Sequence, residues 1–133
     1  MTTMRTTFGK SGWRTIGDKK IYCRSIWEAN YARFLQCLKD QKTIKDWEYE
    51  PETFWFDGIR RGCVSYLPDF KVYTNDSKHH WIEVKGWLDP KSATKIKRFR
   101  KYYPNEELFL IDKNWFQKNS QKLHCVIKDW EIG

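Results

Sequence analysis

The strongest constraint on the fold of this chain is a change in the period of its apolar residues at Lys42. Over residues 25–40 apolar residues recur at the i, i+3, i+4 spacing of a helix, and Ser25 is a suitable N-cap. After Lys42 the pattern alternates with a period of two, and the runs 46–50 and 53–56 each end at a proline or a glycine turn. The sequence therefore predicts one helix followed by short strands.

Further extended runs at 63–67, 70–74 and 80–85 predict more strands. The last two flank a turn at 75–78, which predicts an antiparallel hairpin. Beyond the hairpin, Asp89 is a suitable cap, so a second helix is predicted from that point.

This second helix runs to about Tyr103, where Pro104 prevents its continuation. The nearly all-apolar run 107–111 predicts a strand that is buried on both faces. The remainder through Trp130 predicts one more short element of undetermined type. The order α-β-β-β-α-β indicates an α/β fold with a mixed central β-sheet flanked by helices.

The charge balance favours a polyanionic partner. The chain has 25 Lys and Arg residues against 17 Asp and Glu residues, a net charge of +8, and nucleic acid is the usual partner of such a basic domain. Its 133 residues suit one domain. Residues 1–20 are basic and show little periodicity, so we expect a flexible arm there and a single domain over 21–133.

Apolar content and cysteine spacing argue against a membrane or secreted protein. No apolar run approaches the ~20 residues that span a bilayer, and the first residues lack the apolar centre of a signal peptide. The four cysteines contain no C-x-x-C pair, which favours reduced thiols over a disulfide scaffold or a zinc site. A cytoplasmic protein without membrane contact is therefore expected.

The residues best suited to catalysis lie at the predicted hairpin, in Pro68-Asp69 and Glu83-Val84-Lys85. A turn centred on Ser77 pairs Asp69 with Lys85 and places Asp69 and Glu83 diagonally on one face, with Cα atoms about 7–8 Å apart. Two carboxylates with a lysine beside them suit a divalent hard cation and a water molecule. The alternative is a solvated face with surface ion pairs.

Glu28 adds a third acidic candidate, in the first turn of the predicted helix 25–40. The sequence Ser25-Ile-Trp-Glu28 is also a capping box, in which the Glu side chain returns a hydrogen bond to the cap residue. The capping role and the site role both remain open for Glu28.

In this order, Glu28, Pro68-Asp69, Glu83-Val84-Lys85 and a basic helix, the chain resembles the PD-(D/E)XK nuclease superfamily. With Trp-Glu-Tyr-Glu-Pro at 47–51, it is most similar to the phage endonuclease I type of Holliday-junction resolvases and related small phage nucleases. The resemblance covers about residues 21–112. It implies a restriction-endonuclease-like core and hydrolysis of DNA phosphodiester bonds that depends on Mg²⁺, for which Mn²⁺ can substitute.

The resemblance also implies a role for each motif residue. Asp69 and Glu83 correspond to the metal-binding acids, and Lys85 corresponds to the motif lysine. Glu28 corresponds to the acid of the first helix, which also takes part in catalysis and metal binding. The main-chain carbonyl of Val84 corresponds to a further metal ligand. Lys85 could orient the attacking water, assist its deprotonation or stabilise charge on the phosphate, and the sequence does not choose among these roles.

The second helix is the predicted grip on the DNA backbone, because its cationic side chains have no acidic neighbour. These residues are Lys91, Lys95, Lys97, Arg98, Arg100 and Lys101. Its expected buried stripe consists of Ala93, Ile96 and Phe99. Phosphate contacts from such a face give affinity without reading sequence, and a merely solvated face is the alternative. Trp81 and Trp87 flank the predicted site and are the aromatic residues expected to contact DNA.

These features together predict a metal-dependent DNA endonuclease, acting on branched or structured DNA such as Holliday junctions. The alternative is a non-catalytic nucleic-acid-binding domain that keeps the nuclease fold. The intact set of Glu28, Asp69, Glu83 and Lys85 favours the enzyme. The resemblance implies a phage-encoded protein of the bacterial cytoplasm, and the two symmetric cuts of a resolvase favour a homodimer.

Overall fold

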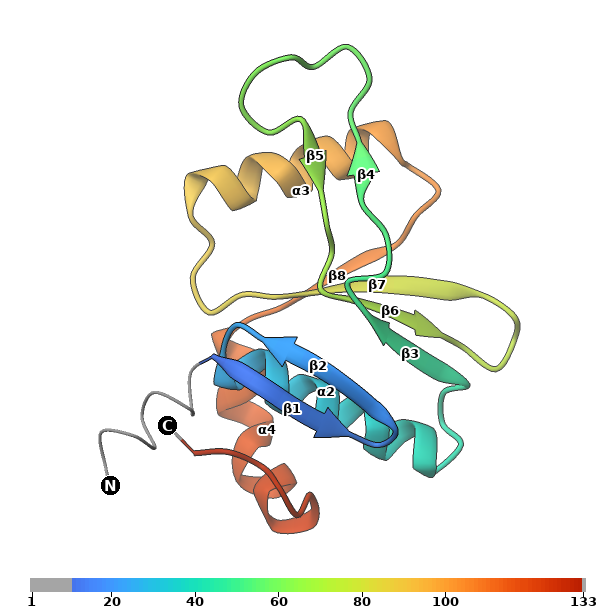
Figure 1. Ribbon diagram of the computed structural model, residues 1–133, viewed down its shortest axis with the longest axis vertical. Helices are drawn as coiled ribbons and strands as arrows, with labels where there is room; N and C mark the ends of the chain where they lie inside the picture. Colours follow the sequence, from blue (N-terminus) through green and yellow to red (C-terminus); the bar gives the residue numbers. More distant parts are fainter. Residues whose placement is uncertain (1–10, 133) are drawn as a thin grey trace.

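The computed structural model describes residues 11–132, and a four-stranded mixed sheet in the order β3-β6-β7-β8 lies at its centre (Figure 1). The strands are β3 (Asp46–Tyr49), β6 (Phe70–Tyr73), β7 (His79–Val84) and β8 (Leu108–Ile111). The pairs β3–β6 and β6–β7 are antiparallel, whereas β8 runs parallel to β7. The predicted α/β class with a mixed central sheet flanked by helices is confirmed.

Three helices flank this sheet, with α3 on one side and α2 and α4 on the other (Figure 1). They are α2 (Ile26–Asp40), α3 (Pro90–Tyr102) and α4 (Lys113–Val126). Each begins after a side-chain cap, at Ser25, Asp89 and Asp112 respectively. The predicted short last element is therefore a full helix. Within residues 11–132, the helices lack the length and apolar character needed to cross a membrane.

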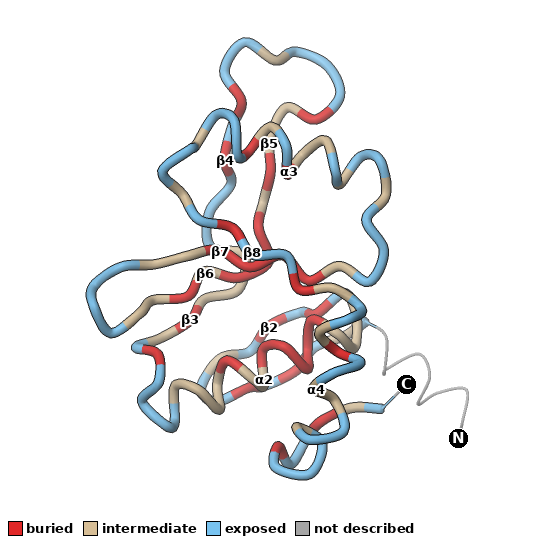
Figure 2. Tube along the Cα trace, turned by 180° about the vertical axis from the view of Figure 1, so that it is seen from behind, coloured by how far each residue is buried: buried red, intermediate tan, exposed pale blue. Residues whose placement is uncertain are grey.

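Each face of the sheet has its own apolar core, which Figure 2 shows as the buried centre of the chain. On the side of α2 the core includes Leu35, Trp47, Phe70, Ile82 and Val84. On the side of α3 it includes Phe54, Tyr66, Trp81, Ile96 and Phe99. Residues 81–84 of β7 are therefore buried on both faces, whereas in β6 only Phe70 and Val72 are buried.

The prediction of a flexible arm at 1–20 is wrong for residues 12–20, which belong to a hairpin. Strands β1 (Gly12–Ile16) and β2 (Lys19–Cys23) form a hairpin that packs on α2. Gly17, in the tight turn between the strands, adopts a φ of 64°, which glycine tolerates readily. The alternate residues that the hairpin buries are Arg14, Ile16, Ile21 and Cys23. The prediction for residues 1–10 concerns a segment outside the described residues.

The strands predicted at 53–56 and 63–67 are shorter and lie apart from the main sheet. They are β4 (Phe54–Trp55) and β5 (Ser65–Tyr66), which pair only with each other in a two-stranded ribbon beside α3 (Figure 1). Phe54 packs against Phe99 of α3 with ring centroids 4.8 Å apart. The ribbon therefore covers the α3 side of the sheet instead of extending the sheet.

Strand β8 also differs from its prediction, because it is not buried on both faces. Phe109 is 47% exposed, and Leu110 is exposed as well. In the described part of the chain β8 is an edge strand of the sheet, and β7 is its neighbour. Its apolar run, which would suit an enclosed strand, is therefore only partly buried.

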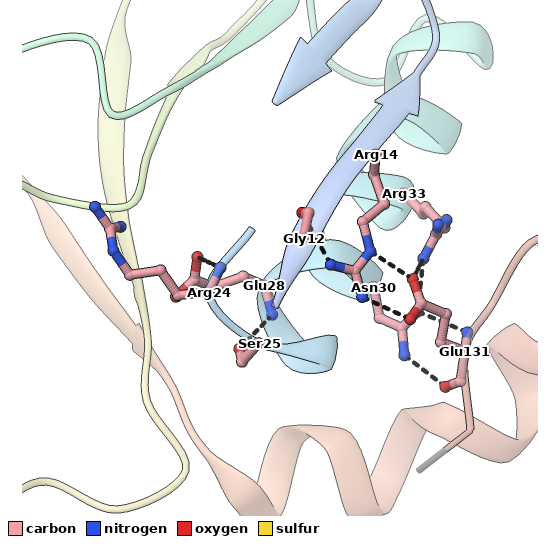
Figure 3. Close-up of polar contacts among 8 residues, drawn as sticks. All are labelled: Gly12, Arg14, Arg24, Ser25, Glu28, Asn30, Arg33 and Glu131. Carbon is pink, nitrogen blue, oxygen red and sulfur yellow. Dashed lines mark hydrogen bonds and ion pairs between the residues drawn. The ribbon is translucent and has the colours of Figure 1, made fainter. Parts of the chain in front are cut away.

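The last described residues are fixed to α2 and β1 by a buried polar cluster (Figure 3). The Glu131 carboxylate accepts hydrogen bonds from Arg14, at 2.8 and 3.0 Å, and from Arg33, at 2.6 Å. Asn30 bonds both main-chain groups of Glu131, accepting from its N–H at 2.8 Å and donating to its carbonyl at 2.8 Å. This cluster joins three segments that are far apart in the sequence.

Replacing Asn30 should therefore destabilise the protein. Asn30→Ala leaves two main-chain groups of Glu131 without partners, and we expect a loss of about 1–3 kcal/mol in the free energy of unfolding, measured with urea. Asn119→Ala is the matched control, because its amide bonds only the Trp115 carbonyl one helical turn earlier. Equal stabilities of the two variants would contradict this role of Asn30.

Candidate active site

The predicted hairpin brings its two acids together, although its register differs. The expected pairing of Asp69 with Lys85 is wrong by two residues, because the structure pairs Phe70 with Ile82. A shift of two leaves every side chain on its original face, whereas a shift of one would reverse the faces. Extended by one residue, the observed register places Asp69 directly opposite Glu83 instead of diagonal to it.

Asp69 is a buried carboxylate, with 7% of its surface exposed. Its Oδ2 accepts a hydrogen bond of 2.7 Å from the main-chain N–H of Val84, which joins the ends of the two strands. Burial, reinforced by the negative charges of Glu83 and Glu28, raises the pKa of Asp69 well above its ordinary value. Asp69 therefore has the strongly perturbed environment that is common at active sites.

Glu83 is 8% exposed and is held by a tyrosine that the sequence analysis did not select. The hydroxyl of Tyr66 donates a hydrogen bond of 2.5 Å to Glu83 Oε1. Burial raises the pKa of Glu83 to about 6, against the lowering effects of this hydrogen bond and of Lys85. Burial and the adjacent carboxylate also raise the pKa of Tyr66, which keeps this hydroxyl a donor. Tyr66 is therefore a positioning residue for Glu83.

Glu28 lies at the start of α2 and in the cavity of the two acids, and its side chain accepts from the N–H of Arg24 instead of the Ser25 N–H that a capping box predicts. Its main-chain N–H donates to the hydroxyl of the N-cap Ser25 at 3.1 Å, so the predicted helix start is confirmed (Figure 3). Glu28 Oε1 accepts from the N–H of Arg24 at 3.2 Å, one residue before the cap, and from the Tyr49 hydroxyl at 2.7 Å. The same buried carboxylate lines the cavity that contains Asp69 and Glu83.

This cavity, which we call the carboxylate cavity, has a volume of about 340 Å³. It brings together all four residues predicted to be catalytic. Its ionisable lining residues are the acids Glu28, Glu50, Asp69 and Glu83 and the cations Arg24, Lys85 and Lys95. The sequence analysis missed Arg24 and Glu50, which form an ion pair across the cavity edge. The hint for Glu50 is its place in the Trp-Glu-Tyr-Glu-Pro run.

The donor set of the carboxylate cavity fits a hard divalent cation. Asp69 and Glu83 offer carboxylate oxygens, and Val84, the predicted carbonyl ligand, also lines the cavity. Within residues 11–132, no three acidic, histidine or cysteine side chains form a ready-made group of metal ligands. Mg²⁺ is commonly held by one or two carboxylates and several water molecules, so this pair of acids suits it better than a soft metal.

The cationic residues of α3 divide into two groups. Lys95 lines the carboxylate cavity, and Lys91 and Lys97 are exposed. Arg98 and Arg100 are instead tied to the protein, donating to the main-chain carbonyls of Cys63 at 2.8 Å and Leu108 at 3.0 Å. Two of the cations predicted to bind DNA therefore hold α3 to other parts of the protein.

Two further details of α3 bear on its predictions. Ile96 and Phe99 form the buried stripe as predicted, but Ala93 is exposed, which corrects that expectation. The exposed Lys101 lies over the ring of Tyr102, 5.9 Å from its centroid. Its ammonium group therefore remains near the surface, where a phosphate can reach it.

The two tryptophans expected to contact DNA have opposite environments. Trp81 is 1% exposed, packs against Phe54 at 5.0 Å between ring centroids, and donates to Glu106 at 2.6 Å. The prediction that it contacts DNA is therefore wrong, because α3 and the ribbon cover its face of the sheet. Trp87 is 74% exposed and stays available to a ligand.

Residues 10–122 match a family described as "Protein of unknown function (DUF1064)". This match spans every residue of the carboxylate cavity and most of α4. No curated protein matches the chain.

The two buried acids should make stability fall as the pH rises. An acid whose pKa is raised by folding stabilises the fold while protonated, so this contribution is present below its ordinary pKa and is lost as the pH passes through the raised value. We expect Asp69→Asn, in the absence of divalent cations, to raise the free energy of unfolding at pH 8 by about 1 kcal/mol or more. The gain should disappear near pH 4.

Thermal or urea unfolding between pH 4 and pH 8 measures this difference, and Asp76→Asn is its control. Asp76 is an exposed carboxylate in the turn of the same hairpin, and hydrogen bonding lowers its pKa. The control should show no gain at pH 8. Parallel pH profiles for Asp69→Asn and the unsubstituted chain would show that the pair is not strained by charge.

Proposed function

We propose that this chain, which belongs to the DUF1064 family of proteins of unknown function, is a metal-dependent DNA endonuclease of the PD-(D/E)XK type. One observation carries the proposal. Two buried carboxylates, Asp69 and Glu83, share an open cavity with Lys85 and with Lys95 of a basic helix. Burying like charges side by side is costly, and such a cost is typical of a site that binds a cation.

One main-chain group and one side chain hold the two acids that would bind the metal. The N–H of Val84 holds Asp69, and the hydroxyl of Tyr66 holds Glu83. A Mg²⁺ ion bound to these acids would polarise the scissile phosphate and lower the pKa of its bound water. Lys85 lines the cavity, with its Nζ 4.0 Å from Asp89, and can orient water, assist its deprotonation or stabilise charge on the phosphate.

The charges of the cavity explain why a cation is required. Its four carboxylates outnumber its three cationic side chains when all of them are ionised, so the fully ionised cavity carries one excess negative charge, which disfavours phosphate. A divalent cation reverses this sign. Phosphate binding and cation binding are therefore coupled in the proposed enzyme.

The proposed DNA-binding surface extends from the carboxylate cavity along α3 to the ribbon. Lys91 and Lys97 are exposed on α3, and Arg60 and Arg61 are exposed in the loop that joins β4 to β5. Arg98 fastens this loop to α3 through the carbonyl of Cys63. We include in the proposal a preference for branched DNA such as Holliday junctions, and a homodimer, because both follow from the resemblance to resolvases.

Nicking of supercoiled plasmid tests the proposed activity. The unsubstituted chain should nick plasmid with Mg²⁺ or Mn²⁺ and not with EDTA. Asp69→Asn and Lys85→Ala should each lower the rate by a factor of about 100 or more, because each removes a catalytic group. In EDTA both should keep most of the DNA affinity of the unsubstituted chain, because the exposed lysines of α3 remain.

Lys78→Ala is the matched control for Lys85→Ala, because Lys78 is an exposed lysine at the turn end of the same hairpin. It should nick at the normal rate. Cleavage by Asp69→Asn at the normal rate would mean that the site is misplaced. Binding without cleavage under several metals would favour the alternative, a non-catalytic nucleic-acid-binding domain.

Glu28→Gln separates the capping role of Glu28 from its catalytic role. The amide oxygen of glutamine can accept the same hydrogen bonds from Arg24 and Tyr49, so we expect a thermal midpoint within about 2–4 °C of the unsubstituted chain. Metal-dependent nicking should fall by a factor of about 100 or more, since the negative charge is lost.

Glu48→Gln is the control for this variant. Glu48 also accepts a hydrogen bond from a tyrosine hydroxyl, that of Tyr73, but it does not line the carboxylate cavity. It should retain nicking activity. If Glu28→Gln is equally stable and equally active, Glu28 is a capping residue alone.

A further inference from the structure

A second cavity, which we call the indole cavity, adjoins the carboxylate cavity. Its volume is about 480 Å³, within the range of small-molecule sites. Both cavities are lined by Arg24, Glu28, Val84 and Lys85, so they share one wall. The other residues lining the indole cavity are Ser25, Trp27, Gly86 and Trp87. A ligand whose phosphate lies at the shared wall would have its next group among two indoles.

One indole of this cavity is held in place by packing. The ring of Trp27 stacks on Phe116, with centroids 4.5 Å apart and an interplanar angle of 26°. The ring also lies directly against Gly86, where an added Cβ would approach it to 2.8 Å. Gly86 is therefore a residue that permits this close approach, and the Trp27 wall is already formed without a ligand.

The other indole is exposed. Trp87 has 74% of its surface accessible, although it follows directly on Gly86 at the end of the catalytic strand. It is a large apolar side chain that the two cores of the protein do not use. Burial of its face by a flat ligand would remove this apolar surface from water.

We propose that the indole cavity binds an unpaired nucleobase of the DNA strand, next to the phosphate at the carboxylate cavity. This inference rests on the proposed nuclease function and specifies its substrate class. The lining of the two cavities matches the two halves of a nucleotide. The cations at the shared wall suit the phosphate, and the indoles can stack on the base. Arg24 and Lys85 both keep part of their side chains exposed for this contact.

A base that is paired inside a duplex cannot stack on a protein side chain without leaving its neighbours. Bases in single strands, flaps and branch points are already unstacked, or become so at small cost. The preferred substrate is therefore DNA in which a base at the position of cleavage is unpaired, or is easily unpaired as at a branch point. Sequence preference should be weak, because every base has a face that can stack.

The test compares two probes of equal charge in EDTA, with the Asp69→Asn chain as the parent protein. One is a short fluorescent oligothymidylate, and the other is the same backbone with abasic residues in place of the thymidines. Fluorescence anisotropy should show that the oligothymidylate binds at least about 5-fold more tightly. Adding Trp87→Leu should lower the ratio, because only the Trp27 indole then remains, whereas Trp87→Phe, which keeps an aromatic face, should retain most of it.

Phe109→Leu is the matched control, because Phe109 is an exposed aromatic residue of β8 that does not line the indole cavity. Its ratio should equal that of the parent. Equal binding of the two probes by the parent overturns the base site, and plasmid nicking by the unsubstituted chain would still support the nuclease. A preference that Trp87→Leu leaves unchanged overturns the assignment to this cavity. A preference that depends on Trp87, in a chain that does not nick, supports the base site and overturns the nuclease.

Discussion

Two carboxylates buried side by side at the ends of β6 and β7 are the constraint on which the rest of the site depends. Burial is the main cause of the raised pKa values of both acids, and the negative charge of Glu83 raises the pKa of Asp69 further. The fold tolerates the pair because each acid is held by a donor, Val84 N–H or Tyr66 hydroxyl, and because a separate apolar core stabilises each face of the sheet. The β1–β2 hairpin lies farther from the acids, packs on α2 and places Arg14 in the polar cluster around Glu131.

Much of this arrangement could be predicted from the sequence because it depends on local rules. The helix over 25–40 follows from its cap and apolar period, and the shared face of Asp69 and Glu83 follows from the alternation of strand residues. The predicted register was wrong by two residues, yet the acids still met, because a face depends only on whether the shift is even. The parts that depend on distant partners escaped prediction. Tyr66 reaches Glu83 only because the ribbon folds back over α3, and the edge position of β8 depends on how many strands the sheet has.

The contrast between Trp81 and Trp87 has the same origin. Trp81 lies within β7 and Trp87 lies three residues after its end, and alternation alone places Trp81 on the face of the acids. That face is covered by the ribbon and α3, so Trp81 is a core residue, while Trp87 lies beyond the strand end, where the cover stops. The sequence does not indicate this second apolar layer, because β4 and β5 are only two residues long and contribute one core residue each, Phe54 and Tyr66. Trp87 is thus exposed because the apolar layer of α3 and the ribbon does not extend beyond the end of β7.

The helix α3 joins these features, and its cations therefore have unequal functions. Arg98 and Arg100 bond main-chain carbonyls of the ribbon loop and of β8, so their charges are partly neutralised by protein dipoles. Lys91 and Lys97 make no such contact in residues 11–132, and their charge is available to a polyanion. Substitution of Arg98 would remove a phosphate contact and would also loosen the ribbon that carries Tyr66. A loss of DNA affinity in such a variant would therefore have two causes that cannot be separated. Only the exposed lysines can report the electrostatic contribution to binding by itself, because their replacement leaves the support of Glu83 in place.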